Sequence, residues 1–409
     1  MKAYPRLQKV AAVLVGATLF ASGSFKLIDP VGTGLIVEEY GKLFHLGFLT
    51  GRFAEVAGYL LSLLETVCGG ALLTGVFRRT FRGIALGLIG LFTLVTVYLA
   101  VKNPAMDCGC FGEVLHLSHT ASLVKNLVLL GLCFLSLTPH VEPPSSGRPR
   151  YVAGVVMALV VIAAAVRAVI GIPPSDFTEF TPGVELAAAQ PDDAPDGEDY
   201  SAAFIYEKDG RTASFSLDAV EKAENEGWSF IRTETLRRAA AAPQDEVVTL
   251  SFLNREDLPC DSLAAGGKVM IVSVYDTPRM KPADWQRSLE LLRRAGEAGM
   301  QPLLLVEAPL SELDATALAG LSDGDYLRQC SYQADRRKLL ALNRDNGGAT
   351  YFSDGMLVMK WAAGGAPSGE QWEALLSTDP VEAMMVSSAE GRMTVHGYFL
   401  VALAVALLL

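Results

Sequence analysis

Residues 83–113 read GIALGLIGLFTLVTVYLAVKNPAMDCGCFGE, an apolar run followed at once by a short loop that holds two cysteines. The run from Gly83 to Val101 contains no charged residue, and about 20 such residues carry a helix across the hydrocarbon core of a bilayer. The stretch therefore predicts a membrane-spanning helix that places Cys108 and Cys110 at one face of the membrane.

Other apolar runs of similar length lie on both sides of this helix. Five good candidates for spanning helices occupy residues 10–28, 53–77, 83–101, 121–137 and 151–172. A sixth run, residues 395–409, would form about 22 Å of helix, which is shorter than the roughly 30 Å hydrocarbon core. It is a clipped span, a tilted anchor or the place where the sequence was cut. The pattern predicts a polytopic α-helical membrane protein.

Composition and charge support this class and exclude another. Hydrophobic residues make up 51% of the chain and charged residues 19%, whereas soluble domains carry about 25% charge. Residues 1–172 hold 14 Lys and Arg against 8 Asp and Glu, while residues 173–409 hold 20 against 37. These counts fit a basic membrane part followed by an acidic water-facing part. The acidic balance argues against nucleic-acid binding, which needs a basic surface.

The basic residues of the short loops predict the orientation of the spans. They gather at the N-terminus and in the links after the second and fourth spans: Lys2, Arg6, Lys9, Arg78, Arg79, Arg82, Arg148 and Arg150. Because loops rich in Lys and Arg stay in the cytoplasm, residues 29–52, 102–120 and 173–394 are expected to face outward. Residues 1–24 could instead be a cleaved signal peptide, but Lys26 and Asp29 just beyond them favour a retained helix.

The outward segment is expected to be a linker followed by an α/β domain. Residues 173–202 are rich in Pro, Asp, Ala and Glu, as linkers are. From residue 203 the pattern becomes globular, with strands expected at 203–206, 247–252, 268–275, 301–307, 349–352 and 356–361 and helices at 284–298, 336–343 and 368–377. This order predicts a thioredoxin-like domain over residues 203–392. Its usual Cys-x-x-Cys is missing, because Asp-Thr-Pro-Arg-Met follows Tyr275.

The strongest candidate for chemistry is the loop Cys108-Gly109-Cys110 after the third span. Gly109 gives the backbone the freedom that two such close cysteines need to bring their sulfurs together. A disulfide across one residue is strained, and strained disulfides exchange readily. Cations lower the pKa of a thiol, and three lysines are expected at the outer helix ends: Lys26, Lys102 and Lys125. A redox-active pair, a static disulfide and a metal site are the alternatives.

The metal alternative rests on His116 and His119, which follow the two cysteines. Together they give four ligands within 12 residues, of the types that zinc and copper accept. The spacing matches no standard zinc finger, and a histidine pair in a loop is usually solvated.

Four further cysteines lie away from this loop. Cys68 and Cys133 fall within spans, where we interpret them as small core hydrophobes. Cys260 and Cys330 fall in the outward domain. In an oxidising compartment they could form a structural disulfide, and two buried free thiols are the alternative.

Glu65 lies near the middle of the second span. An ionised group there costs about 2.5–3.5 kcal/mol on the insertion scale unless it faces the interior of a bundle. Either Glu65 has a functional role beside a partner, or it is a protonated acid hydrogen-bonded to a neighbouring helix. Lys26 and Asp29 belong to the same functional surface or are interface residues that snorkel.

These residues together resemble the DoxX/MauE-like membrane proteins, in the Bacteroidota form that joins a four-helix unit to a thioredoxin-like tail. The resemblance covers residues 8–140 and rests on these motif residues: Gly23, Asp29, Pro30, Glu65, Asp107, Cys108, Gly109, Cys110, Phe111, Gly112, Lys125 and Asn126. In the tail, the residues similar to the family are Tyr326, 344–348, Asp354, Gly355, Lys360 and Trp361. The four-helix unit is akin to the vitamin K epoxide reductase and disulfide-bond-formation bundles.

The resemblance implies a four-helix unit over 8–140, a fifth span at 151–172 and a terminal segment at 395–409, all in the inner membrane, with the large domain in the periplasm. The family's methylamine-utilisation member is associated with maturing a disulfide-rich dehydrogenase subunit. The implied function is thiol–disulfide exchange or maturation of periplasmic protein partners, with these expected catalytic residues: Cys108, Cys110, Lys26 and Glu65. The alternative is a non-catalytic assembly protein with a static disulfide and a docking domain. Membrane lipid is an expected partner, and a quinone is left open as a cofactor, since the bundle has no second outer cysteine pair.

Overall fold

The computed structural model describes residues 3–104, 106, 108–115, 117–137, 148–175, 177–186, 200–208, 211–215, 228–237, 248–315, 318, 321 and 324–407. The chain forms two compact units, of which the first comprises Met1–Glu185 and Ser251–Leu409 and the second Leu186–Leu250. The first unit contains a helical bundle and an α/β domain, and the second contains a small sheet.

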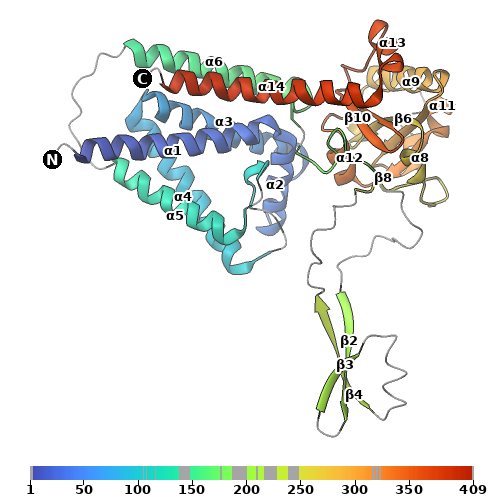
Figure 1. The fold of residues 1–409 in the computed structure, drawn as a ribbon, viewed down its shortest axis with the longest axis horizontal. Helices are drawn as coiled ribbons and strands as arrows, with labels where there is room; N and C mark the ends of the chain where they lie inside the picture. The colour runs from blue at the N-terminus through green and yellow to red at the C-terminus, as the bar shows by residue number, and fades with distance from the viewer. Residues whose placement is uncertain are drawn as a thin grey trace. The chain divides into compact units, whose positions relative to one another are not determined.

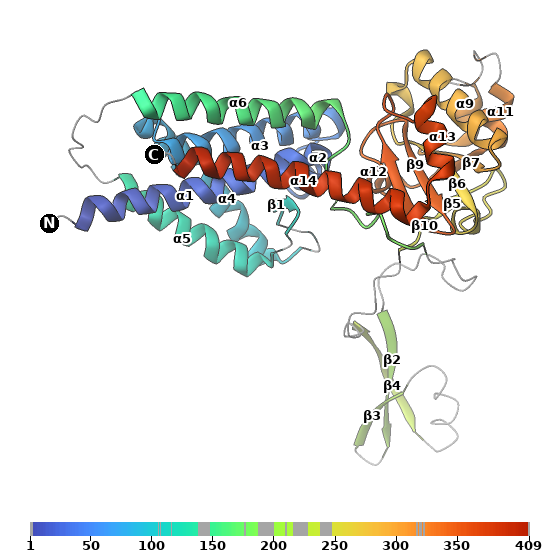
Figure 2. The same cartoon turned by 45° about the horizontal axis from the view of Figure 1, so that its top comes forward.

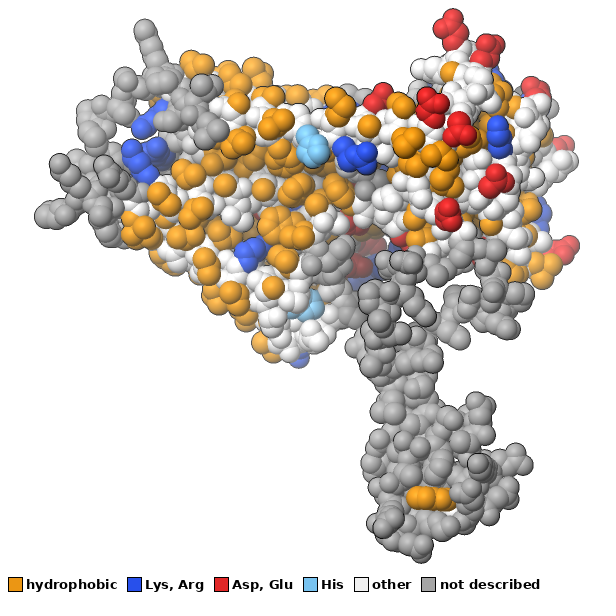
Figure 3. All heavy atoms as spheres, viewed as in Figure 1, with side chains coloured by type: hydrophobic (Ala, Val, Ile, Leu, Met, Phe, Trp, Pro, Cys, Tyr) orange, Lys and Arg blue, Asp and Glu red, His pale blue; other side chains and the backbone are white. Residues whose placement is uncertain are grey.

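Within the described residues, five helices of the bundle are long and apolar enough to cross a membrane, by length and composition. They are α1 (Ala3–Ile28), α3 (Gly51–Thr74), α4 (Arg78–Lys102), α5 (His119–Leu137) and α6 (Arg148–Ile170). Each corresponds to one of the five apolar runs of the sequence, so that prediction is confirmed. Hydrophobic side chains cover the visible face of this helical part, while acidic side chains gather over the α/β part (Figure 3).

Glycines set the closest packing in the bundle, between α1 and α3. A Cβ at Gly23 would lie 2.5 Å from the backbone nitrogen of Thr66, and one at Gly69 would lie 2.3 Å from that of Phe20. Small residues allow two helix backbones to approach each other inside a membrane, where packing replaces the hydrophobic effect as the driving force. The motif residue Gly23 therefore has a structural role in holding α1 against α3.

A helix that the sequence did not predict, α2 (Pro30–Leu43), occupies most of the expected loop 29–52. Asp29 is its N-cap residue, and the side chain accepts a hydrogen bond of 3.0 Å from the backbone N–H of Gly32. Pro30 stands at the first helical position, where its missing N–H costs nothing. The motif pair Asp29-Pro30 thus starts a short helix rather than a loop.

The C-terminal helix α14 (Pro380–Leu407) is longer than the expected segment 395–409. It lies beside α6 in both views of the fold (Figures 1 and 2). The ring of Tyr398 stacks on Phe20 with 6.0 Å between centroids, and Phe399 lies 5.1 Å from Phe25. Although α14 is not among the five candidate spans found in the described residues, its apolar half is part of the bundle.

The α/β domain is built on a six-stranded sheet in the order β10-β9-β6-β7-β8-β5. Its strands are β5 (Phe252–Leu253), β6 (Lys268–Val274), β7 (Gln301–Val306), β8 (Ser331–Ala334), β9 (Gly348–Ser353) and β10 (Met356–Trp361). Strands β6, β7 and β8 are parallel, and the remaining pairs are antiparallel. The helices are α8 (Ser262–Ala265), η1 (Thr277–Arg279), α9 (Pro282–Glu297), α10 (Leu310–Ala315), α11 (Gly324–Gln329), α12 (Arg336–Leu342) and α13 (Glu370–Ser377). Strands β6 and β7 are buried along almost their whole length, as strands covered on both faces are.

The boundaries of the α/β domain differ from the expected 203–392. Strands β2 (Tyr200–Lys208), β3 (Arg211–Phe215) and β4 (Ser229–Arg237) form an antiparallel sheet of their own in the second unit. Part of the expected linker 173–202 belongs to the α/β domain instead, since Phe180 is fully buried and the backbones of Gly183 and Val184 bond to Leu357. Residues 187–199 of that linker lie outside the described residues.

The four cysteines away from the loop are free thiols. Cys68 and Cys133 are buried together in the bundle core, as expected. Cys330 is buried in the core of the α/β domain, whereas Cys260 is partly exposed. Their thiols face different backbone carbonyls, those of Tyr326 and Leu258. The possible disulfide between Cys260 and Cys330 is therefore not formed; both are free thiols, and of the two only Cys330 is buried as the alternative required.

Candidate functional site

Cys108 and Cys110 face each other in the loop between α4 and α5, with their sulfurs 3.0 Å apart. Both are free thiols; Cys108 is buried and Cys110 is half-buried. Gly109 between them has a φ of +60°, a left-handed conformation that glycine adopts without strain. A Cβ at this position would lie 2.5 Å from Cγ2 of Ile36. The sequence correctly predicted that Gly109 brings the two sulfurs together.

Two hydroxyl groups hold the backbone of this loop. Tyr40 on α2 donates a hydrogen bond of 2.6 Å to the carbonyl oxygen of Cys108. Ser22 on α1 donates one to the carbonyl oxygen of Cys110, the first residue of the short strand β1 (Cys110–Glu113). The carbonyl groups of both cysteines are thus held by hydrogen bonds from two different helices.

The charge around the pair favours one thiolate. A hydrogen bond from the Cys108 thiol, with Lys125 and Lys26 nearby, holds the pKa of the Cys110 thiol well below its usual range, although burial acts in the opposite direction. The same hydrogen bond, together with burial, raises the pKa of Cys108. Lys125 also lies over the ring of Phe111, with its Nζ 4.8 Å from the ring centroid. Of the two thiols, Cys110 is therefore the one whose surroundings favour the thiolate form.

Lys26 and Glu65 form a buried ion pair between α1 and α3. The Lys26 Nζ lies 2.7 Å from Glu65 Oε2, and the two side chains are 7% and 2% exposed. The ammonium group also lies 5.0 Å from the centroid of the Phe92 ring. The charge of Glu65 is thus compensated by the neighbouring helix, as a charge at that depth requires. Lys26 and Lys125 lie near the thiols as expected, while Lys102 stands exposed at the end of α4.

A cavity of about 370 Å³ adjoins the two thiols. It brings together seven of the expected site residues: Lys26, Glu65, Cys108, Gly109, Cys110, Lys125 and Asn126. Its other walls are mostly apolar and include the rings of Tyr40, Phe44 and Phe92. Asn126 is held in place by a 3.2 Å hydrogen bond to the Thr96 hydroxyl. The arrangement is an apolar chamber with thiols at one wall and a buried ion pair at another.

The geometry gives little support for a metal site at the cysteine loop. His119 is engaged by Asn103 Oδ1 at 3.1 Å and by the carbonyl oxygen of Met106 at 2.9 Å. His116 and the motif residue Asp107 lie outside the described residues. Within the part of the chain that the structure describes, no group of three or more His, Cys, Asp and Glu side chains could hold a metal ion.

An arginine of the α/β domain completes the surroundings of the loop. Arg344, which follows α12, donates from Nε and Nη2 to Asp29 Oδ2 at 3.0 and 2.7 Å, and Nη2 also bonds Glu113 at the end of β1. The side chains of Arg344 and Asp29 are 5% and 6% exposed. Gly32 makes room for this contact, since a Cβ there would lie 2.9 Å from Arg344 Nη2. We call this set of residues, Asp29, Glu113 and Arg344, the arginine clamp.

Three further ion pairs join the α/β domain to the same end of the bundle. They are Arg279–Glu55 at 3.1 Å, Arg336–Glu38 at 3.8 Å and Arg337–Glu39 at 3.1 Å. All three are partly exposed, so each contributes about 0–1 kcal/mol. The arginine clamp is the buried member of this interface, and the only one of the four pairs whose carboxylates adjoin the cysteine loop.

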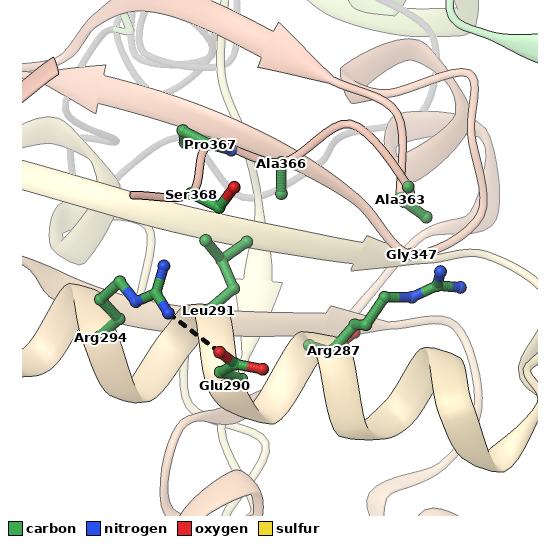
Figure 4. Close-up of a pocket in the computed structure, with 11 residues that line it drawn as sticks. Arg287, Glu290, Leu291, Arg294, Gly347, Ala363, Ala366, Pro367 and Ser368 are labelled. Atoms are coloured by element: carbon green, nitrogen blue, oxygen red, sulfur yellow. Dashed lines mark hydrogen bonds and ion pairs between the residues drawn. The ribbon is translucent and has the colours of Figure 1, made fainter. Parts of the chain in front are cut away.

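A second, smaller hollow lies on the α/β domain between α9 and the loop after β10 (Figure 4). Arg294 pairs with Glu290 at 2.9 Å across one turn of α9, and Arg287 extends along the same helix. The loop side is formed by Ala363, Ala366, Pro367 and Ser368. Among the described residues that line this hollow, no nucleophile lies beside a base and Glu290 is the one acid.

Comparison with known proteins identifies a family for the first part of the chain. The family model Methylamine utilisation protein MauE matches residues 5–139, which are α1 to α5 with the cysteine loop. The match confirms that this segment resembles the MauE proteins. Together with the apolar helices, it shows that the chain is a multi-pass membrane protein. No curated protein and no solved structure matches the chain.

Proposed function

Residues 5–139 form a membrane unit of the MauE family, and from this premise we propose that the protein is a membrane-bound thiol–disulfide exchange protein that works through Cys108 and Cys110. The observation that carries the proposal is the pair of free thiols with sulfurs 3.0 Å apart beside an apolar chamber that Lys125 and the Lys26–Glu65 ion pair also line. A purely structural cysteine pair would not require a lowered thiol pKa at its more exposed member.

The proposed reaction is an exchange between this pair and a disulfide of a partner protein. The thiolate of Cys110 attacks one sulfur of that disulfide, which forms a mixed disulfide and releases the other partner sulfur as a thiolate. Cys108 then loses its proton and attacks Cys110, so the partner leaves with both sulfurs reduced and the Cys108–Cys110 disulfide forms. Two electrons pass from the pair to the partner, and the reverse sequence oxidises a partner dithiol.

We place the thiols and the α/β domain on the periplasmic side of an inner membrane. Support comes from the basic residues near the N-terminus and beside the links between α3 and α4 and between α5 and α6, which predict a cytoplasmic position: Lys2, Arg6, Lys9, Arg78, Arg79, Arg82, Arg148 and Arg150. The rings of Phe77 and Tyr151, with centroids 6.3 Å apart, bring the start of α4 beside the start of α6, so that two of these basic helix ends lie together. The α/β domain and β1 contact the opposite helix ends through the arginine clamp.

We further propose that the α/β domain is a thioredoxin-like docking domain without its own redox pair. The parallel arrangement β6-α9-β7, followed by the antiparallel hairpin β9-β10 and α13, supports this interpretation. Asn346 contacts the chain directly after β6: its Oδ1 accepts hydrogen bonds from the backbone N–H groups of Tyr275 and Asp276. In this picture the domain recognises a partner protein, and the bundle performs the exchange.

The chamber beside the thiols also fits the quinone that the sequence left open. Its volume of about 370 Å³ and its aromatic residues Tyr40, Phe44 and Phe92 suit a flat apolar ring. A quinone bound there would supply an acceptor for two electrons and two protons. The residues that would donate hydrogen bonds to its oxygens are Lys26 and Asn126, which also line the chamber.

A second candidate function, a non-catalytic assembly protein, is favoured by one observation. Asp276, Thr277, Pro278 and Arg279 occupy the segment where a redox-active thioredoxin carries its cysteines, and Arg279 is used to bind Glu55 of the bundle. On this alternative the α/β domain docks a partner and the cysteine pair is static.

Redox tagging in native membranes distinguishes the two functions. A thiol-reactive polyethylene-glycol maleimide should label Cys108 and Cys110 after reduction and neither after mild oxidation with diamide, while the Cys260→Ser variant should behave like the parent. The Cys108→Ser variant should accumulate a mixed disulfide through Cys110, and Cys110→Ser should accumulate far less, because Cys108 is buried. A tagging pattern that no oxidant or reductant changes would establish the static alternative. Metal analysis of the purified protein and of a His119→Ala variant tests the third possibility, metal handling.

A further inference from the structure

A groove between α6 and α14 is open and apolar. Its volume is about 320 Å³, and Ile28 of α1 contributes to its lining. Small residues keep it open: Ala163, Ala164 and Ala168 on α6 and Gly397 on α14. A Cβ at Gly397 would meet no atom within 4 Å, so this glycine is not needed for close helix packing and instead leaves space.

A polar pocket of about 560 Å³ continues this groove at one end. The two share Arg167, Pro174 and Thr394, which line both. The pocket adds two more cations, Arg392 and Lys360. Among the described residues that line the pocket, Glu390 is the one with an acidic side chain. Three basic side chains of the pocket therefore accompany one acidic side chain. The combined space is apolar along its length and basic at its end.

The change from apolar to basic falls at the end of the spanning segments. The span in α6 covers Arg150–Val169 and therefore closes just after Arg167. On α14 the residues after Thr394 are apolar apart from His396, Gly397 and Tyr398, and the residues before it include Arg392 and Glu390. The basic pocket therefore lies at the depth of the lipid headgroups, and the groove lies at the depth of the acyl chains.

We infer that this groove and pocket bind one anionic phospholipid of the surrounding membrane, with an acyl chain between α6 and α14 and the phosphate among Arg167, Arg392 and Lys360. Arg167 donates one N–H from Nη1 to the carbonyl oxygen of Ile172 at 3.1 Å, which fixes the guanidinium at the pocket and leaves further N–H donors for a phosphate. Lys360 is the next-to-last residue of β10 in the α/β domain, so the bound headgroup would contact both the bundle and that domain. This site is separate from the thiol chamber and goes beyond the proposed exchange function.

The test is native mass spectrometry of the full-length protein in detergent, titrated with phosphatidylglycerol or with phosphatidylcholine. The parent should bind one phosphatidylglycerol about tenfold more tightly than phosphatidylcholine. The double variant Arg167→Gln/Arg392→Gln should lose most of this preference. Gly397→Leu, which fills the groove, should weaken the binding of both lipids.

Matched controls separate this site from general lipid contact. Arg150→Gln removes a cation from the opposite end of α6, and Gly90→Leu fills a position on α4 where a Cβ would likewise meet no atom within 4 Å. Both should bind phosphatidylglycerol like the parent. Equal affinity for the two lipids in the parent, equal losses in the control and site variants, or binding of glycerol 3-phosphate as tight as that of phosphatidylglycerol would each overturn the inference. Helix content by circular dichroism confirms that a variant with lost binding is still folded.

Discussion

Replacing Arg344 with glutamine should release the α/β domain from the cysteine loop. The substitution removes the guanidinium of the arginine clamp and leaves the carboxylates of Asp29 and Glu113 facing each other. The Asp29 side chain is 6% exposed and that of Glu113 is 24% exposed. Asp29 therefore stays in a dry environment without its counter-ion, which is the costly outcome for a buried ion pair.

The size of the effect follows from the contacts that are lost. Removing one partner of a buried pair costs about 3–5 kcal/mol. Because Glu113 is partly hydrated, we place the value near the lower end, at about 3 kcal/mol, which corresponds to a change of about 10²-fold in the docking equilibrium. Arg337→Gln is the matched control, since its partner Glu39 lies 3.1 Å away on the surface and the two side chains are 64% and 31% exposed. Such a pair contributes about 0–1 kcal/mol.

Hydrogen–deuterium exchange of the full-length protein in detergent measures both variants. Peptides covering α2 and β1 should exchange about 10²-fold faster in Arg344→Gln and at nearly the parental rate in Arg337→Gln. Adding Asp29→Asn to Arg344→Gln should recover part of the loss, because the carboxylate that needed the arginine is gone. Equal exchange in the two single variants would refute the reasoning that the arginine clamp holds the domain.

Three further outcomes test the site. Gly109→Ala should slow formation of the loop disulfide and destabilise the protein by about 1–3 kcal/mol, because Gly109 has a φ of +60° and an added Cβ would lie 2.5 Å from Ile36. Gly47→Ala is the control, since a Cβ at Gly47 would meet no atom within 4 Å. Equal melting temperatures of the two variants would contradict this explanation. The pKa of the Cys110 thiol is lowered to about 5, against about 8.5 for a free cysteine. The rate at which iodoacetamide alkylates Cys110 should therefore stay high as the pH falls from about 8 and decrease only near pH 5. A decrease already near pH 8 would argue against an activated thiol. Glu65→Gln leaves a buried ammonium without its counter-ion and should cost about 3–5 kcal/mol, measured as thermal stability in detergent, whereas an unchanged melting temperature would mean that the pair is not buried in the membrane.

Most of the bundle was predictable because a spanning helix is a local feature of the sequence. An apolar run such as residues 83–101 identifies itself without reference to the rest of the chain. Helix α2 was missed for the opposite reason: its sequence PVGTGLIVEEYGKL mixes glycines and charges and shows no long apolar run. Its start is fixed by Asp29, whose capping role depends on a single hydrogen bond.

The candidate site was predictable in its centre and not in its partners. Cys108, Gly109 and Cys110 are adjacent in the sequence, so their chemistry could be inferred from local geometry. Lys26 and Glu65 were both recognised, but their pairing across two helices was not. Arg344 was missed as a site residue because 315 positions separate it from Asp29, although both lie in segments that resemble the family. Contacts at such separation depend on the docking of whole domains, which no local pattern encodes.

The position of the α/β domain between α6 and α14 has a consequence for how tightly it must bind. Since both neighbouring helices are packed in the bundle, the domain is tethered to the membrane at its beginning and at its end. Its return to the cysteine loop is a unimolecular event at an effective concentration of the order of millimolar. A partner protein that competes for the cysteine loop must therefore outcompete a permanently attached neighbour, and dilution of the protein gives it no advantage.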